Sequence, residues 1–141
     1  MQVQSLSNLE HINIILMHSK NTATRILVAE DIDFNYLLVK AILNKKYTLI
    51  RAKNGVEAVE LYNTQSFDLI LMDIKMPLMD GIEATKIIRK KDTKIPIIAV
   101  TAYAFDTDKT LAIEAGCNSY LVKPIDSELL IKEINSLLSN K

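Results

Sequence analysis

Five polar side chains that follow short apolar segments are of the types that phosphoryl transfer requires. Glu30, Asp31 and Asp73 are carboxylates, Thr101 carries a hydroxyl and Lys123 carries an amine. Mg²⁺ takes hard oxygen ligands, usually one or two carboxylates together with water and phosphate oxygens. An amine and a hydroxyl can hold phosphoryl oxygens, and a carboxylate can itself accept a phosphoryl group. The residue types therefore indicate phosphate chemistry, provided that the fold brings them together.

The apolar segments before these residues are typical of parallel strands that are buried on both faces. Each is short and rich in β-branched or bulky residues, without strict alternation of apolar and polar residues. Thr48–Ala52 is more polar and favours an edge strand. The other four segments are Ile26–Ala29, Leu69–Met72, Ile97–Val100 and Tyr120–Val122.

Helical spacing of apolar residues separates these strands. Gly116 is a helix stop after the fourth pattern, and Asp126 is an N-cap before the fifth. The five sets of residues that we expect to face the core are Leu37, Leu38, Ala41 and Ile42; Val56, Val59 and Tyr62; Ile82, Ile87 and Ile88; Leu111, Ala112 and Ala115; and Leu129, Leu130, Ile134, Leu137 and Leu138.

Five strands that alternate with five helices predict an α/β fold, a flavodoxin-like open parallel sheet with helices on both faces. In the strand order 2-1-3-4-5, ligands bind where the order reverses, at the carboxyl ends of strands one and three. These two strands deliver Glu30, Asp31 and Asp73. Asp73 ends the central strand, which makes it the candidate nucleophile.

Composition narrows the classes of function. The 141 residues include 17 basic and 17 acidic side chains, so a formal net charge of zero argues against nucleic acid or an anionic membrane as the main partner. A single cysteine, Cys117, excludes an internal disulfide and fits a reducing compartment. No apolar stretch approaches the roughly 20 residues that span a bilayer. We expect a cytoplasmic protein.

Residues 1–24 have no place in the alternation of strands and helices, whereas residues 25–141 form one domain. Ser7–Glu10 resembles a capping box, and Leu9, Ile12, Ile15 and Leu16 then suit a short amphipathic helix. This extension is interpreted either as a linker to a longer parent protein or as a docking or dimer-forming segment.

From about Thr24 to Leu138 the sequence resembles the receiver domain of two-component response regulators. Four blocks carry the resemblance: Ile26–Asp31, Asp68–Gly81, Pro96–Ala102 and Tyr120–Pro124. The resemblance implies a signalling switch that promotes only its own phosphorylation and dephosphorylation, rather than a conventional enzyme.

The resemblance also implies roles for individual residues. Asp73 would be the phosphoacceptor, with Mg²⁺ held by Asp73, Asp31, Glu30 through a water, and the backbone carbonyl of Lys75. Mn²⁺ or Ca²⁺ could substitute for Mg²⁺ in a crystal. Thr101 and Lys123 would contact the phosphoryl group, Thr101 and Tyr120 would form the conformational switch, and the Lys123–Pro124 bond would be cis.

Ala29–Asp31 with Asn35, and Thr101–Ala104, most resemble the receivers of hybrid histidine kinases. The donor would then be a phosphohistidine on a histidine kinase or on a histidine phosphotransfer domain. Ile32 departs from the pattern, because many such receivers carry Asn there. We hypothesise that Lys75 and Tyr103, each two residues past a site residue, tune the rate at which water removes the phosphoryl group.

Three other readings compete with this one. A haloacid-dehalogenase-type phosphatase needs an acid two residues after its nucleophile, where this chain has Lys75. A flavodoxin-like nucleotide carrier would suffer repulsion between its phosphate and Glu30 and Asp31. An unphosphorylated receiver-like interaction module predicts a degraded acidic pocket, whereas all five positions are intact.

A single-domain regulator and a segment of a larger kinase both fit the sequence, and pairing of two copies is left open.

Overall fold

The computed structural model describes residues 8–12, 23–43, 45–103 and 105–140. Every strand begins and ends within one residue of its predicted bounds. Strands and helices alternate along the chain as β1 Arg25–Ala29, α2 Asp33–Leu43, β2 Thr48–Ala52, α3 Gly55–Thr64, β3 Leu69–Asp73, α4 Gly81–Arg89, β4 Ile97–Thr101, α5 Asp106–Ala115, β5 Ser119–Val122 and α6 Ser127–Ser139.

The five strands form one parallel sheet in the order β2-β1-β3-β4-β5, which confirms the predicted fold class. The order reverses between β1 and β3, where Ala29 pairs with Met72. Because all strands run in the same direction, their carboxyl ends lie at one edge of the sheet. The predicted site residues therefore meet at that edge.

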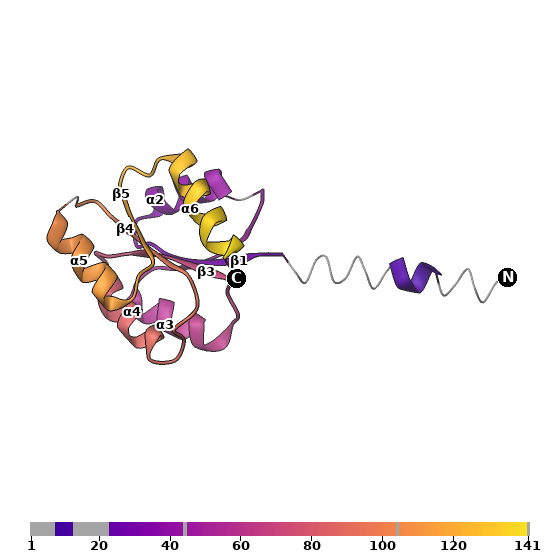
Figure 1. Cartoon of the computed structure of the whole chain (residues 1–141), viewed down its shortest axis with the longest axis horizontal. Helices are drawn as coiled ribbons and strands as arrows, with labels where there is room; N and C mark the ends of the chain where they lie inside the picture. Colours follow the sequence, from indigo (N-terminus) through magenta and orange to yellow (C-terminus); the bar gives the residue numbers. More distant parts are fainter. Residues whose placement is uncertain (1–7, 13–22, 44, 104, 141) are drawn as a thin grey trace.

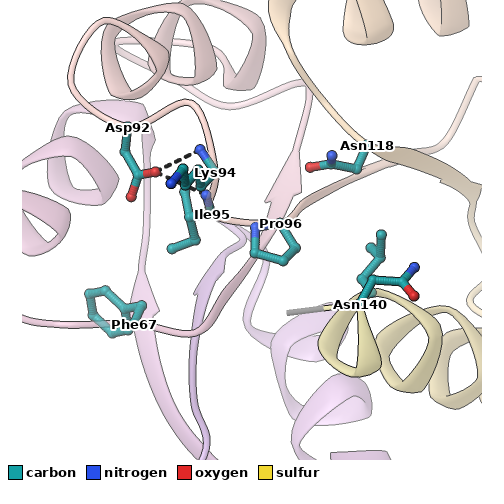
Figure 2. Close-up of a pocket in the computed structure, with 8 residues that line it drawn as sticks. Phe67, Asp92, Lys94, Ile95, Pro96, Asn118 and Asn140 are labelled. Atoms are coloured by element: carbon teal, nitrogen blue, oxygen red, sulfur yellow. Dashed lines mark hydrogen bonds between the residues drawn. The ribbon is translucent and has the colours of Figure 1, made fainter.

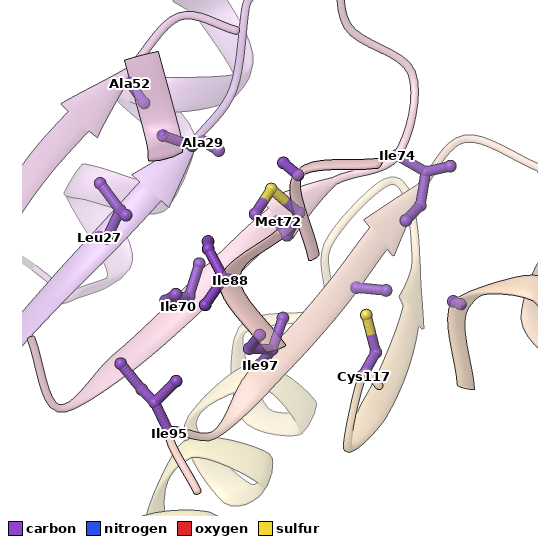
Figure 3. Packing of buried hydrophobic residues seen from close by; sticks show 14 residues of the cluster. Leu27, Ala29, Ala52, Ile70, Met72, Ile74, Ile88, Ile95, Ile97 and Cys117 are labelled. Carbon is purple, nitrogen blue, oxygen red and sulfur yellow. The ribbon is translucent and has the colours of Figure 1, made fainter. Parts of the chain in front are cut away.

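Two apolar clusters cover the two faces of the sheet. Figure 1 shows α3, α4 and α5 on one side of the sheet and α2 and α6 on the other. Side chains of a strand alternate between the faces, so Leu27 joins one cluster and Val28 joins the other. Helices α3, α4 and α5 pack on the first face, which Figure 3 shows with Met72, Ile88 and Ile97 at its centre. Helices α2 and α6 pack on the second face. Strand β3 is buried along its whole length, which fixes the position of Asp73.

Local signals in the sequence set the helix ends. The side chain of Asp126 accepts a hydrogen bond from the backbone N–H of Leu129 at 3.0 Å, as expected of an N-cap. Gly116 ends α5 in the left-handed conformation, with φ of 117°. Both predicted caps are confirmed.

The apolar face predicted for the first helix packs on the core only in part, because Ile42 contacts the core whereas Leu37, Leu38 and Ala41 are exposed. Leu37 and Leu38 of α2 are 58% and 37% exposed, whereas Val39 and Leu43 are buried at 3% and 1%. Leu111 of α5 and Leu129 of α6 are also exposed, although their helical neighbours pack as predicted. The sequence of α2 carries apolar residues on two sides, and only tertiary packing selects the side that is buried.

Residues 8–12 form a short helical segment whose side chains are exposed, in line with the short helix expected in the extension (Figure 1). Leu9 and Ile12 are 55% and 51% exposed. The predicted continuation through Ile15 and Leu16 lies outside the described residues.

Candidate functional site

The five predicted site residues lie at the carboxyl ends of four strands. Glu30 and Asp31 follow β1, Asp73 ends β3, Thr101 ends β4 and Lys123 follows β5. The register places Asp73 beside Val100 and Thr101 beside Val122, so adjacent strands deliver these side chains to one place. The structure thus brings together the residues that the sequence singled out.

Lys123 connects the acids of the first and third strands. Its amine donates to Glu30 Oε1 at 2.6 Å and to Asp73 Oδ2 at 3.2 Å. Glu30 and Asp73 are each only 4% exposed. A buried carboxylate is unfavourable unless it is paired and hydrogen-bonded, so the amine stabilises two charges that would otherwise repel each other.

The pKa values of the two buried carboxyls, Asp73 and Glu30, shift in opposite directions. Burial, followed by proximity to Glu30, raises the pKa of Asp73 from 3.8 to about 7. Burial alone would raise the pKa of Glu30 as well, but hydrogen bonds from Lys123, Asp73 and the N–H of Ile32 outweigh it and hold that pKa below its usual value. Burial disfavours the charged amine of Lys123, yet its two acidic partners raise its pKa. In the absence of a metal, Asp73 therefore holds a proton more readily than Glu30 does.

The acidic cluster fits a small dication. Glu30, Asp31 and Asp73 each offer an oxygen, and these oxygens lie within 4.8 Å of one another. Asp31 Oδ1 is buried and has no hydrogen-bond partner. An unsatisfied buried carboxylate oxygen is rare in a folded protein, and a bound cation would supply its missing partner.

Thr101 and Tyr120 both contact the loop that follows β4. Thr101 is fully buried, and its hydroxyl oxygen accepts a hydrogen bond from the N–H of Tyr103 at 3.2 Å. The hydroxyl of Tyr120, on β5, donates to the carbonyl of Tyr103. The ring of Tyr103 is 48% exposed and stacks on Phe105. The predicted switch pair is therefore joined through the backbone of one loop residue.

Two close backbone contacts position the loop between β3 and α4, which carries Lys75. The N–H of Gly81 donates to the carbonyl of Ile74 at 2.9 Å, and a Cβ at Gly81 would overlap the carbonyl oxygen of Asp73. The N–H of Gly55 donates to the carbonyl of Met79 at 2.9 Å. Gly81 lies in the sequence block that carries the resemblance, yet only the structure shows its contact with Asp73. The side chain of Lys75 is exposed, and the Lys123–Pro124 bond is cis as expected.

Arg51 of β2 is a positioning residue that sequence reasoning missed. Its Nε donates to the carbonyl of Glu30 at 3.0 Å, and its Nη1 pairs with Asp33 at 2.7 Å. The guanidinium also lies 4.8 Å from the ring centroid of Tyr36. These contacts hold the turn between β1 and α2, and the charged residue in the predicted edge strand was the only signal for them.

Comparison with known proteins gives the same result as the geometry. Residues 26–135 match the response regulator receiver domain family. The chain is 37% identical over 118 residues to the polar-differentiation response regulator DivK of Brucella anthropi, a match that covers 82% of this chain and 96% of DivK. The chain belongs to the response regulator receiver domain family, and it is a receiver domain of two-component phosphorelay signalling.

Other similarities extend to receivers within larger proteins. The chain is 41% identical over 122 residues to hybrid signal transduction histidine kinase I of Dictyostelium discoideum, a match that covers 79% of this chain but only 7% of the kinase. The chain thus spans a small part of the hybrid kinases that it matches.

Solved structures give the same picture. A receiver domain of a sensor histidine kinase from Pseudomonas aeruginosa has a TM-score of 0.78 and 33% identity over 84% of this chain and 99% of that domain. That structure has a magnesium ion coordinated in its active-site cleft. The complex of the Saccharomyces cerevisiae phosphotransfer protein Ypd1 with the receiver of Ssk1 matches with a TM-score of 0.76 and 34% identity, covering 82% of this chain and 88% of that chain.

Within the described ranges, no helix is both long and apolar enough to cross a membrane.

Proposed function

We propose that Asp73 accepts a phosphoryl group from a phosphohistidine when Mg²⁺ is bound in the acidic cluster. The observation that carries this proposal is the shared amine of Lys123, which bonds both Asp73 and Glu30 beside the unpartnered oxygen of Asp31. In the transfer, the P–N bond of the donor breaks as a carboxylate oxygen of Asp73 forms a P–O bond, and the imidazole nitrogen leaves. Only an ionised Asp73 can attack, and a nearby dication favours that ionised form.

Asp31 and Asp73 would hold the metal directly, Glu30 through a water, and Lys75 through its backbone carbonyl. Bound Mg²⁺ supplies neutralisation of the phosphoryl oxygens as charge redistributes between donor and acceptor. Lys123 would exchange its bond to Asp73 for one to a phosphoryl oxygen, and Thr101 would donate its hydroxyl to another. The same residues would also assist hydrolysis, so that the domain promotes its own phosphorylation and dephosphorylation.

Thr101 and Tyr120 would report the phosphorylated state. The supporting observation is that both residues contact Tyr103, Thr101 through the N–H and Tyr120 through the carbonyl. Movement of Thr101 toward a phosphoryl oxygen would remove the acceptor of the Tyr103 N–H. The β4–α5 loop and the Tyr120 ring would then change position together.

We further propose that a histidine phosphotransfer domain or a histidine kinase docks on the exposed apolar stripe of α2. Phe34, Leu37 and Leu38 are 73%, 58% and 37% exposed. Phe34 and Leu38 line a small cavity together with Lys123, so the stripe adjoins the proposed acceptor site. A contiguous exposed apolar surface marks a protein interaction site. The complex of Ypd1 with the Ssk1 receiver is a precedent for such a partner.

Transfer from a phosphorylated histidine phosphotransfer domain tests the function directly. Label should move from the donor to the wild-type chain in the presence of Mg²⁺, and no label should reach Asp73→Asn. Retention of the label on the donor, or equal labelling of Asp73→Asn, would contradict the proposal.

The same assay tests the docking surface. Phe34→Ser combined with Leu37→Ser should slow transfer from the protein donor about tenfold or more, because about 1.4 kcal/mol of lost interface energy is tenfold in affinity. Phosphorylation by acetyl phosphate, which needs no docking, should be unchanged. Leu111→Ser removes a similarly exposed leucine on α5 and serves as the control. Equal slowing by Leu111→Ser would remove the assignment to α2.

A cytoplasmic location and the pairing of two copies stay predictions.

A further inference from the structure

A cavity of about 820 Å³ lies at the amino ends of the strands, at the opposite edge of the sheet from the acidic cluster (Figure 2). Its polar acceptors already have partners within the chain. Asp92 accepts hydrogen bonds from the N–H groups of Lys94 and Ile95 at 2.8 and 2.9 Å. Asn118 accepts one from the N–H of Ile97 at 2.9 Å. These acceptors are therefore satisfied by the fold itself.

Unpaired buried polar atoms lie at the carboxyl edge instead. In the described part of the chain, these are Asp31 Oδ1, in the turn between β1 and α2, and Arg51 Nη2, on the neighbouring strand β2. An unpaired buried N–H disfavours the folded state. Nη2 thus adds nothing to stability, and the reason for a guanidinium at this place lies with its other two nitrogens.

The other two nitrogens of Arg51 bind the two ends of the turn. Nε donates to the backbone carbonyl of Glu30, just after β1, at 3.0 Å, and Nη1 pairs with Asp33, the first residue of α2, at 2.7 Å. The guanidinium also lies 4.8 Å from the ring centroid of Tyr36 on α2. Because the donors of a guanidinium point in fixed directions, these contacts fix the end of β1 relative to the start of α2.

The turn that Arg51 spans carries the acids of the first strand. The N–H of Glu30 donates to the carbonyl of Ala52 at 2.9 Å, so β2 holds the backbone of Glu30 through both its N–H and its carbonyl. Asp31 follows directly and offers an oxygen to the acidic cluster, whose oxygens lie within 4.8 Å of one another. Residues that hold metal ligands in place, without touching the metal, contribute to metal affinity.

We propose that Arg51 sets the Mg²⁺ affinity of the acidic cluster by holding Glu30 and Asp31 in the conformation that binds the ion. The charge and the hydrogen bonds of Arg51 act in opposite directions, because a nearby cation disfavours a dication whereas preorganised ligands favour it. The hydrogen bonds prevail, since the charge is paired with Asp33. This role rests on the Mg²⁺ site of the function proposed above.

Titration of the full chain with Mg²⁺, followed by the backbone amide resonances of Glu30 and Asp73, tests this role through the dissociation constant. Arg51→Gln should raise that constant about tenfold, since supporting residues contribute about 10–100-fold to metal affinity. Arg51→Lys keeps the charge but lacks the planar fork, so it should weaken binding by a similar factor. Lys53→Gln removes an exposed cation directly after β2 and is the matched control, with wild-type or slightly tighter binding.

Labelling by acetyl phosphate separates a positioning role from a defect of the fold. At saturating Mg²⁺, both Arg51 variants should be labelled at about the wild-type rate, because the bound ion then holds its own ligands. A defect of the fold would lower the rate at every Mg²⁺ concentration.

Three results would overturn the role of Arg51 and leave the proposed function standing. Wild-type affinity in both Arg51 variants would show that the turn keeps its geometry without the guanidinium. Tighter binding by Arg51→Gln would show that the charge prevails over the hydrogen bonds. Slow labelling at saturating Mg²⁺ would assign Arg51 to the stability of the fold. A wild-type chain that binds no Mg²⁺ would instead overturn the proposed metal site, and the role of Arg51 with it.

Discussion

Lys123 determines the electrostatics of the site, because its single amine satisfies carboxylates from two different strands. Burial and Glu30 together disfavour a charge on Asp73. They raise its pKa to about 7, so this carboxyl ionises near neutral pH in the metal-free protein. Asp31 adds a buried oxygen without a partner. A dication bound between Glu30, Asp31 and Asp73 would stabilise their negative charges, which is the physical reason to expect a metal there.

The raised pKa of Asp73 predicts a pH-dependent stability of the metal-free protein. Between its usual pKa of 3.8 and the folded value of about 7, the folded state keeps a proton that the unfolded state has lost. The stabilisation is therefore complete below about pH 4 and is lost as the pH rises through 7. Asp73→Asn cannot ionise, so its stability relative to wild type should grow from pH 4 to pH 8 by at most a few kcal/mol, at about 1.4 kcal/mol per pKa unit.

Urea unfolding of both proteins in a chelating buffer measures this difference. Saturating Mg²⁺ should reduce the gap at pH 8, because the cation stabilises the ionised Asp73 of the wild type. A gap that does not change with pH would contradict the electrostatic assignment.

The lifetime of the phosphoryl group tests the proposed roles of Lys75 and Tyr103. Both side chains are exposed next to the site and lie two residues beyond Asp73 and Thr101. Lys75→Ala and Tyr103→Ala should each change the rate of dephosphorylation several-fold, since they alter the approach of water. Purified phosphorylated proteins followed by mass would give the rates, with exposed Lys40→Ala on α2 as the control. Decay of both variants at the wild-type rate would rule out the hypothesis.

At the scale of elements, the loop between β3 and α4 is held against the acceptor by glycines rather than by side chains. Any Cβ at Gly81 would overlap the carbonyl oxygen of Asp73. Gly81→Ala should therefore displace the β3–α4 loop, lower the free energy of unfolding by about 1–3 kcal/mol and reduce phosphorylation. Glu83→Ala, two residues further along α4 at an exposed position, is the matched control for urea unfolding and labelling. A Gly81→Ala protein with wild-type stability would refute the packing argument.

The strand ends could be predicted from the sequence because residue type and position agree there. Buried parallel strands read as continuous apolar runs, and the polar residue after each run marks the ligand-binding edge. The buried face of α2 could not be predicted in this way. Its apolar residues fall on two sides of the helix, and Val39 and Leu43 are buried while Leu37 is not. We propose the exposed apolar residues of α2 as a docking surface because Phe34 and Leu38 lie beside Lys123 in the structure.

Contacts that join distant segments were also beyond sequence reasoning. Arg51 bonds the carbonyl of Glu30 across 21 positions, and the Tyr120 hydroxyl bonds the Tyr103 carbonyl across 17. Neither pair has a spacing that a local pattern can reveal. The cavity next to Phe67 likewise arises from three separate loops and the end of α6.

At the scale of the whole molecule, the two edges of the sheet carry different features. The carboxyl edge gathers the acids, Lys123 and Thr101, and the stripe of α2 borders it. The amino edge carries the large cavity and receives the N-terminal extension beside Phe67. The buried sheet lies between the two edges (Figure 1).

The mass of the intact chain after incubation with acetyl phosphate and Mg²⁺ tests the central claim most directly. The wild type should gain the mass of one phosphoryl group, as an adduct that base removes, and the gain should disappear with a chelator. Asp73→Asn should gain nothing while remaining folded. Absence of the gain in the wild type, or the same gain in Asp73→Asn, would contradict the assignment of Asp73 as the phosphoacceptor.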